Sequence, residues 1–249
     1  MEELTYRRAS TLSLERIVEA FNRSFEGYFV PMVHTTDSLR SLITVNDVSL
    51  AHSFAAMDAD DRPMGVVLMA VRGLRGWIGG MGLAPAWRGR GQAAPLMQAA
   101  ITEARTLGLA AVGLEVLAQN APARRLYTRL GFADVRSLAV FTGPLANDLS
   151  PIELPLPVQV IPVARALADF AALHQVPSPW QRDLPALERM APTLSATALL
   201  DGQAIRASLI SMSSKVGYSV MDFGSRAATA DARRDDAIAL IRALVAPMP

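Results

Sequence analysis

The feature that most constrains this chain is the segment Leu83–Met97, which reads LAPAWRGRGQAAPLM. It follows an apolar strand-like run and precedes apolar residues at helical spacing from Ala93 to Ala104. Glycines at 89 and 91 let the backbone approach a ligand closely. Pro95 fits a helix only in its first turn, so we expect the helix to begin at residues 91–94. The segment therefore predicts a phosphate-binding loop at a helix N-terminus, with pyrophosphate as the best-fitting ligand. A glycine-rich turn with no ligand is the alternative.

Two arginines strengthen the phosphate interpretation, because Arg88 and Arg90 can add charge-assisted hydrogen bonds to an anion. The loop is not a Walker motif, since no Gly-Lys-Ser/Thr follows it. It is not the dinucleotide fingerprint either, because the spacing after the strand differs.

Composition excludes several classes of protein. The 249 residues are 51% hydrophobic and carry a net charge of +1, which gives no argument for a nucleic-acid or membrane partner. The chain has no cysteine and three scattered histidines, so we expect no disulfide, no thiolate nucleophile and no metal site. The N-terminus lacks the apolar core of a signal peptide and no apolar run is long enough for a membrane span, so we expect a cytoplasmic protein.

The order of predicted elements suggests a repeated unit. We expect an antiparallel meander over 49–83, a strand over 109–117, a helix opened by Pro122, and a final strand pair at 132–135 and 138–141. A shift of 140 residues lays 64–83 over 204–223 and the helix 92–105 over 232–245, and the second copy lacks the glycine loop. The predicted domains are 1–146 and an incomplete copy at 163–249, joined by a proline-rich linker at 147–162.

A second motif makes the loop more specific. Arg88–Ala93 fits Arg/Gln-x-x-Gly-x-Gly/Ala, and about thirty residues later stands NAPARRLYTRLGF, from Asn120 to Phe132. Together these motifs resemble the GNAT superfamily of N-acetyltransferases, over about residues 1–143. The second copy resembles the degenerate C-terminal half of tandem members. The resemblance implies an α/β fold with a mixed, mostly antiparallel sheet flanked by helices, plus a truncated second half.

The resemblance also implies roles for individual residues. The backbone of Leu83, Ala84 and Pro85 would pair with the pantetheine arm of acetyl-CoA. Asn120 would contact the pantetheine region, and Tyr127 would be the general acid toward the departing thiolate. The alternative for Asn120 is that it serves only as a helix N-cap. The alternative for Tyr127 is that it is only an aromatic residue of the core. The pyrophosphate would be held by the amides of Arg88, Gly89, Arg90, Gly91, Gln92 and Ala93.

The general base is not evident. An amine with a pKa near 10.4 is mostly charged at neutral pH, so its proton must be removed before attack. Many relatives carry a carboxylate on the strand entering the loop, but here Trp77–Gly82 has none. Glu115 on the next strand is a weak candidate; Asp47, Glu26 and His34 are more distant, and a water chain is a further alternative. The four glycines within 76–82 predict a roomy or flexible acceptor side.

These observations predict an N-acetyltransferase that moves the acetyl group of acetyl-CoA to a primary amine by direct attack in a ternary complex. The acceptor is an amine-bearing small molecule or peptide that the sequence does not identify. A non-catalytic acyl-CoA-binding or regulatory module is the alternative function. The truncated second copy could complete its sheet with another chain, so a homodimer is one possible assembly.

Overall fold

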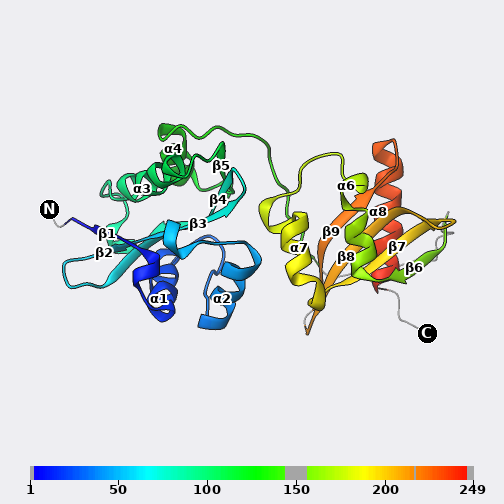
Figure 1. The fold of residues 1–249 in the computed structure, drawn as a ribbon, viewed down its shortest axis with the longest axis horizontal. Coiled ribbons are helices and arrows are strands. Elements are labelled where there is room, and N and C mark those ends of the chain that lie inside the picture. The colour runs from blue at the N-terminus through cyan, green and yellow to red at the C-terminus, as the bar shows by residue number, and fades with distance from the viewer. Residues whose placement is uncertain (1–2, 144–155, 216, 246–249) are drawn as a thin grey trace. The chain divides into compact units, whose positions relative to one another are not determined.

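The computed structural model describes residues 3–143, 156–215 and 217–245 (Figure 1). The chain divides into two compact units, residues 1–138 and 139–249. Most of the predicted linker, up to residue 155, lies outside the described residues. In the described ranges, none of the helices has the length and hydropathy of a transmembrane span.

The first unit is a five-stranded sheet in the order β1-β2-β3-β4-β5. Neighbouring strands are antiparallel except for β4 and β5, which are parallel. Helices α1 and α2 lie on one face, and α3 and α4 lie on the other (Figure 1). The expected mixed sheet flanked by helices is therefore confirmed. The strands are β1 (Thr5–Arg8), β2 (Phe54–Met57), β3 (Pro63–Arg72), β4 (Arg75–Leu83) and β5 (Ala111–Leu114), and the helices are α1 (Leu14–Ser24), α2 (Thr36–Val45), α3 (Ala93–Thr106) and α4 (Ala121–Arg129).

Helix α1 packs directly onto the glycines of β4. A Cβ atom at Gly80 would lie 2.9 Å from the Phe21 ring, and one at Gly82 would lie 2.8 Å from the backbone oxygen of Ser24. Both contacts are shorter than van der Waals distance, so only glycine allows the helix to approach this closely. The expectation of a roomy side along β4 is wrong at Gly80 and Gly82, because α1 fills the space there.

The opposite face holds the main core and the helix that follows the loop. Leu83 from β4 packs there with Leu96 and Met97 from α3. Glu103 of α3 accepts hydrogen bonds of 2.9 and 2.8 Å from the Arg8 guanidinium of β1 and lies 2.8 Å from His52 Nδ1. The bonds from Arg8, with help from His52, lower the pKa of Glu103 to about 2. This ionic cluster ties α3 to the edge of the sheet.

The strand pair expected after α4 is absent. Residues 132–143 form no strand, and Val135, Val140 and Phe141 are about 90% exposed. The expected strand over 109–117 is limited to Ala111–Leu114. Apolar residues such as these favour a strand, but a strand needs a neighbouring edge for its hydrogen bonds, and these residues pair with none here.

The second unit repeats the antiparallel part of the first. Its sheet has the order β6-β7-β8-β9, with every neighbouring pair antiparallel. Its strands are β6 (Val158–Ile161), β7 (Ser195–Asp201), β8 (Ala204–Ser214) and β9 (Gly217–Ser225), and its helices are α5 (Val163–Ala168), α6 (Phe170–Leu173), α7 (Leu184–Met190) and α8 (Ala230–Val245).

The register irregularities of the two sheets correspond. In the first sheet the register shifts after the pair Leu68–Gly80, and in the second after the pair Ile210–Asp222. Leu68 thus corresponds to Ile210 and Gly80 to Asp222, an offset of 142 residues in both strands. The strand registers therefore differ from the ungapped 140-residue alignment expected from the sequence, and a shared origin of the two units stays a prediction.

The second unit carries charged side chains at or near two corresponding positions. Asp222, the counterpart of Gly80, lies 2.9 Å from His174 Nε2, and this contact raises the pKa of His174. After β9, the Ser225 hydroxyl donates to buried Asp236 at 2.6 Å and accepts from the amide of Ala227 at 3.0 Å. A buried carboxylate beside this connection disfavours an anion there.

The close approach of α1 to β4 predicts a large effect of Gly82→Ala. The added methyl group meets the Ser24 backbone, so the free energy of unfolding of the first unit should fall by about 1–3 kcal/mol. Urea unfolding followed by tryptophan fluorescence in a Trp180→Phe background measures this, because Trp77 and Trp87 then report on the first unit alone.

Gly113→Ala on β5 is the matched control, because a Cβ there meets nothing within 4 Å. We expect this variant to change the unfolding free energy by less than about 0.5 kcal/mol. Equal effects of the two variants would contradict the steric role of α1.

Candidate functional site

The glycine loop presents a row of backbone amides. It connects β4 to α3, and Gly89 (φ 72°) and Gly91 (φ 80°) both lie in the left-handed region. Within the described part of the chain, none of the amides of residues 89–93 makes a hydrogen bond. Amides in such alternating turns at a helix N-terminus form an anion-binding concavity. The helix begins at Ala93, which confirms the expected start and places Pro95 in the first turn.

Two aromatic residues hold the loop in place. Trp87 is buried, and the Arg90 guanidinium lies 5.8 Å from the centre of its ring. The Tyr6 hydroxyl of β1 is 3.3 Å from both the backbone oxygen and the side-chain Oε1 of Gln92. Sequence reasoning missed Tyr6, because no local pattern connects β1 with the loop.

Arg88 is bonded within the protein rather than turned toward a ligand. Its Nε donates to the Leu83 carbonyl at 2.8 Å, and its Nη2 donates to the carbonyls of Ser24 and Glu26 at 3.1 and 2.6 Å. Its amide donates to the Pro85 carbonyl at 3.2 Å. This geometry is at odds with the expectation that the Arg88 side chain bonds a phosphate.

The edge of β4 is open beside the loop. The ladder between β4 and β5 ends at the pair Ile78–Leu114, and the β3 register shifts at Gly79. Residues 79–83 have no strand partner on the β5 side among the described residues. An extended ligand could pair with the backbone along this edge.

Tyr127 of α4 reaches this edge from the α3 side of the sheet. Its hydroxyl lies 3.9 Å from Met81 Sδ, and its ring centre lies 5.9 Å from that of Phe132. Burial, with a smaller contribution from Tyr28, raises the pKa of Tyr127 to about 12. The phenol is therefore a neutral proton donor throughout the physiological range, and it also packs in the core, as its alternative interpretation required.

Asn120 begins the helix that carries Tyr127. Its Oδ1 accepts a hydrogen bond from the amide of Ala123 at 3.3 Å, so it caps α4. The N-cap interpretation is thus present in the structure, and contact with a ligand stays a prediction.

Glu115 lies on the α1 side of the sheet, directly after β5. Ile78 and Leu114 belong to the core beneath α3, so strand alternation places Trp77 and Glu115 on the opposite face. The indole Nε1 of buried Trp77 donates to Glu115 Oε2 at 2.6 Å. The sequence pointed to Glu115 but not to the indole that orients it.

The other candidate bases differ in position. Asp47 pairs with Arg72 at 2.5 Å, near the pair Arg72–Arg75 at the end of β4 remote from the loop. His34 lies 2.9 Å from the Ser38 hydroxyl, and burial lowers its pKa. Asp47 is therefore the least suitable of them. In the described residues, no group of three or more His, Cys, Asp or Glu is arranged to hold a metal.

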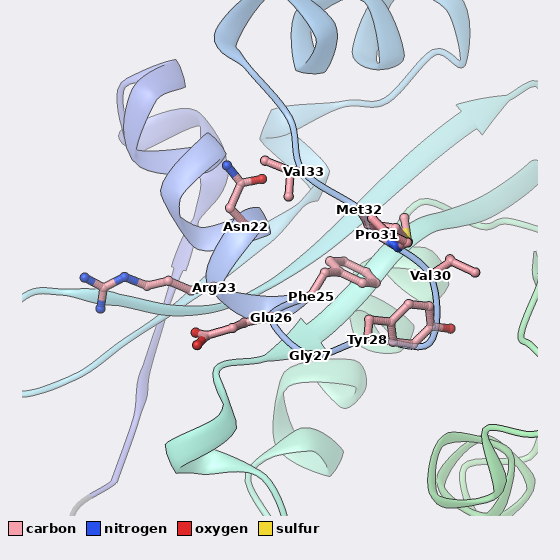
Figure 2. A pocket seen from close by; sticks show the side chains of 10 residues that line it. All are labelled: Asn22, Arg23, Phe25, Glu26, Gly27, Tyr28, Val30, Pro31, Met32 and Val33. Atoms are coloured by element: carbon pink, nitrogen blue, oxygen red, sulfur yellow. The ribbon is translucent and has the colours of Figure 1, made fainter. Parts of the chain in front are cut away.

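An aromatic pocket of about 540 Å³ lies in the segment that follows α1 (Figure 2). The rings of Phe25 and Tyr28 lie with Val30 on one side, whereas the side chains of Arg23 and Glu26 extend the opposite way. Arg23 and Glu26 also line a second pocket of about 610 Å³, which borders loop residues 84–87 and Arg90. The segment after α1 is therefore shared between an apolar pocket and the surroundings of the loop.

Residues 14–132 match the sequence model of the acetyltransferase (GNAT) family. Solved structures that the chain resembles include Ard1 from Thermoplasma volcanium, with 20% identity, a TM-score of 0.44 and coverage of 52% of this chain and 82% of that one. The ribosomal-protein-S18-alanine N-acetyltransferase from Escherichia coli has 19% identity, a TM-score of 0.43 and coverage of 55% and 80%. A GCN5-related N-acetyltransferase from Sphaerobacter thermophilus has 27% identity, a TM-score of 0.41 and coverage of 51% and 40%. No curated protein matches the chain.

The loop geometry predicts that Gly91→Ala weakens anion binding. A side chain in the left-handed region is disfavoured by about 1–2 kcal/mol, so the amides should turn away and pyrophosphate affinity should fall about five- to thirtyfold. Titration calorimetry with inorganic pyrophosphate measures this.

Gly108→Ala is the control. Gly108 has a similar φ of 66° and open space around its Cβ position, but it lies after the C-terminal end of α3. Both variants should lose stability, and only Gly91→Ala should lose affinity. An unchanged affinity in Gly91→Ala would argue against these amides as the anion site.

Proposed function

Because residues 14–132 belong to the GNAT acetyltransferase family, we propose that this protein is an acyltransferase that moves the acetyl group of acetyl-CoA to a primary amine. The observation that carries the proposal is the row of unbonded amides at residues 89–93, which follows β4, the strand whose residue Met81 the Tyr127 hydroxyl contacts. The acceptor is an amine-bearing small molecule or peptide.

The chain's own groups fit the cosubstrate. The amides of residues 89–93 would hold the pyrophosphate, and the open edge of β4 over residues 79–83 would pair with the pantetheine arm. Asn120 at the start of α4 would contact that arm from the other side. Acetyl-CoA supplies an acyl group activated as a thioester, with a thiol as the leaving group.

Tyr127 would act as the general acid. Its phenol keeps its proton at neutral pH, because the pKa is raised to about 12. A thiol titrates near pH 8.5 in water, below the pKa of this phenol. Burial beside Tyr127 would raise the pKa of the departing thiol as well, which brings the two groups closer and favours proton transfer as the C–S bond breaks. Met81 and Phe132 hold the ring beside the strand edge.

Glu115 would accept the proton of the amine. Its carboxylate sits on the sheet face opposite Tyr127, on the strand that diverges from β4. The Trp77 indole fixes one of its oxygens, which leaves the other for a proton or a water. Acid and base on opposite faces of one strand edge suit direct attack, because the amine arrives on one side as the thiol leaves on the other.

The aromatic pocket would receive the acceptor. It follows α1, the helix that packs against β4, and its residue Tyr28 contributes to the raised pKa of Tyr127. Phe25, Tyr28, Val30 and Met32 favour an apolar group next to the amine.

Tyr127→Phe should lower kcat about 100-fold or more, as loss of a general acid does, and change the affinity for acetyl-CoA less than threefold. Because the pKa of Tyr127 is about 12, the wild-type rate should not fall between pH 8 and 10 through loss of this proton. Turnover is measured as thiol release with a panel of primary amines. The chain has no cysteine, so a thiol reagent reports only on CoA.

Tyr218→Phe, an exposed tyrosine of the second unit, is the control and should leave kcat unchanged. Lack of acetyl-CoA binding by calorimetry would overturn the proposed function. Binding without turnover of any amine would favour the alternative, a non-catalytic acyl-CoA-binding module.

Glu115→Gln should lower kcat/KM near neutral pH about 100-fold, because the amide cannot accept a proton but still accepts the Trp77 hydrogen bond. Glu188→Gln, at an exposed position of α7, is the control. An unchanged kcat/KM in Glu115→Gln would assign the base to another group.

A further inference from the structure

The guanidinium of Arg88 joins three separate segments through backbone carbonyls. It bonds Leu83 at the end of β4 at 2.8 Å, Ser24 at the end of α1 at 3.1 Å, and Glu26 beyond it at 2.6 Å. No carboxylate of the described residues pairs with it. Arg88 is therefore held by carbonyl dipoles alone.

These carbonyls are a favourable site for a cation. Ser24 is the last residue of α1, and the last carbonyls of a helix have no partner within the helix and carry the negative end of its dipole. The planar guanidinium presents several donors in a fixed fork, so one side chain reaches all three carbonyls. Arg88 thus completes the C-terminus of α1 from a distant part of the chain.

The clamped carbonyls begin the segment that forms the aromatic pocket. Phe25 and Tyr28, which line this pocket, follow within four residues of Ser24. A change in the position of residues 24–26 would therefore move the pocket wall relative to the strand edge.

The backbone of Arg88 begins the anion-binding loop. Its amide is bonded to Pro85, and the next residue is Gly89. Arg90 differs, since it lies over Trp87 and makes no hydrogen bond within the described residues. Of the two loop arginines, Arg88 alone connects the loop with the pocket segment.

We propose that Arg88 is a positioning residue that couples the anion-binding loop to the order of residues 24–33. The inference rests on the proposed function for the identity of the ligand, CoA. An anion that orders residues 89–93 fixes the backbone of Arg88, and the guanidinium then fixes the segment that forms the aromatic pocket. The acceptor pocket is thereby in place when the cosubstrate is bound.

Hydrogen exchange of peptides covering residues 24–33 tests the clamp in the protein without ligand. Arg88→Ala should speed exchange there about tenfold or more. Arg90→Ala removes the same charge from the same loop and should leave exchange in this segment at the wild-type rate. Arg88→Lys keeps the charge but not the fork and should fall between wild type and Arg88→Ala. Equal rates in the Arg88 variants and the wild type would overturn the inference.

The same measurement with saturating CoA tests the coupling. CoA should slow exchange of residues 24–33 in the wild type and in Arg90→Ala, even if the latter binds CoA more weakly. In Arg88→Ala, CoA should still bind but give no protection there. Because coupling is reciprocal, the affinity for CoA should fall by about the factor by which CoA protects the segment in the wild type.

The outcomes separate the two proposals. If the wild type does not bind CoA, the proposed function fails, and the ligand-free comparison of Arg88→Ala with Arg90→Ala still decides the clamp. If CoA binds and protects residues 24–33 equally in wild type and Arg88→Ala, the inference fails and the proposed function stands. Should Arg88→Ala not fold, Arg88→Lys gives the same comparison.

Discussion

The contact between helix α1 and strand β4 is the constraint on which the first unit depends. Gly80 and Gly82 bring the helix against the strand backbone, with Phe21 and Ser24 occupying the space of the missing side chains. A carboxylate at either position would collide with the helix. In the proposed function the acid and base therefore lie on the neighbours of β4, Tyr127 on α4 and Glu115 after β5.

The same contact fixes where the helix ends and hence what the loop can reach. Because α1 lies against β4, the carbonyls of Ser24 and Glu26 stand within reach of the first loop arginine. In the proposed function the loop binds through backbone amides, so its chemistry needs few particular side chains. What the side chains of Tyr6, Trp87 and Arg88 supply is the position of those amides.

Local rules predicted the features that local chemistry determines. The glycines, the proline in the first turn and the apolar stripe located the loop and the start of α3, and alternating strands gave the meander. The prediction of a strand pair after α4 was wrong. Apolar residues indicate a tendency to form a strand, but they do not show whether a neighbouring strand is available to pair with it. The glycines of β4 were misinterpreted as open space, since their meaning depends on a helix sixty residues earlier in the chain.

The candidate site also combines features that local sequence predicts with features that only the fold determines. Glu115, Tyr127 and the loop could be proposed from the sequence, because residue type suggests the first and motif spacing suggests the other two. The Trp77–Glu115 hydrogen bond, the Tyr6 contact and the inward turn of Arg88 could not, because each joins residues distant in sequence without a periodic pattern. Side-chain direction, unlike residue type, is decided by tertiary packing.

The matching register shifts of the two sheets have a consequence for folding fidelity. One chain contains two antiparallel meanders of the same order with irregularities at corresponding places, which is the situation that favours exchange of strands between nascent units. The residues at the corresponding positions oppose this misassembly. If β9 took the place of β4 beneath α1, Asp222 would stand where Phe21 requires no side chain, and its charge would be buried without His174. Gly80, whose counterpart is Asp222, therefore also restricts α1 to the sheet of the first unit.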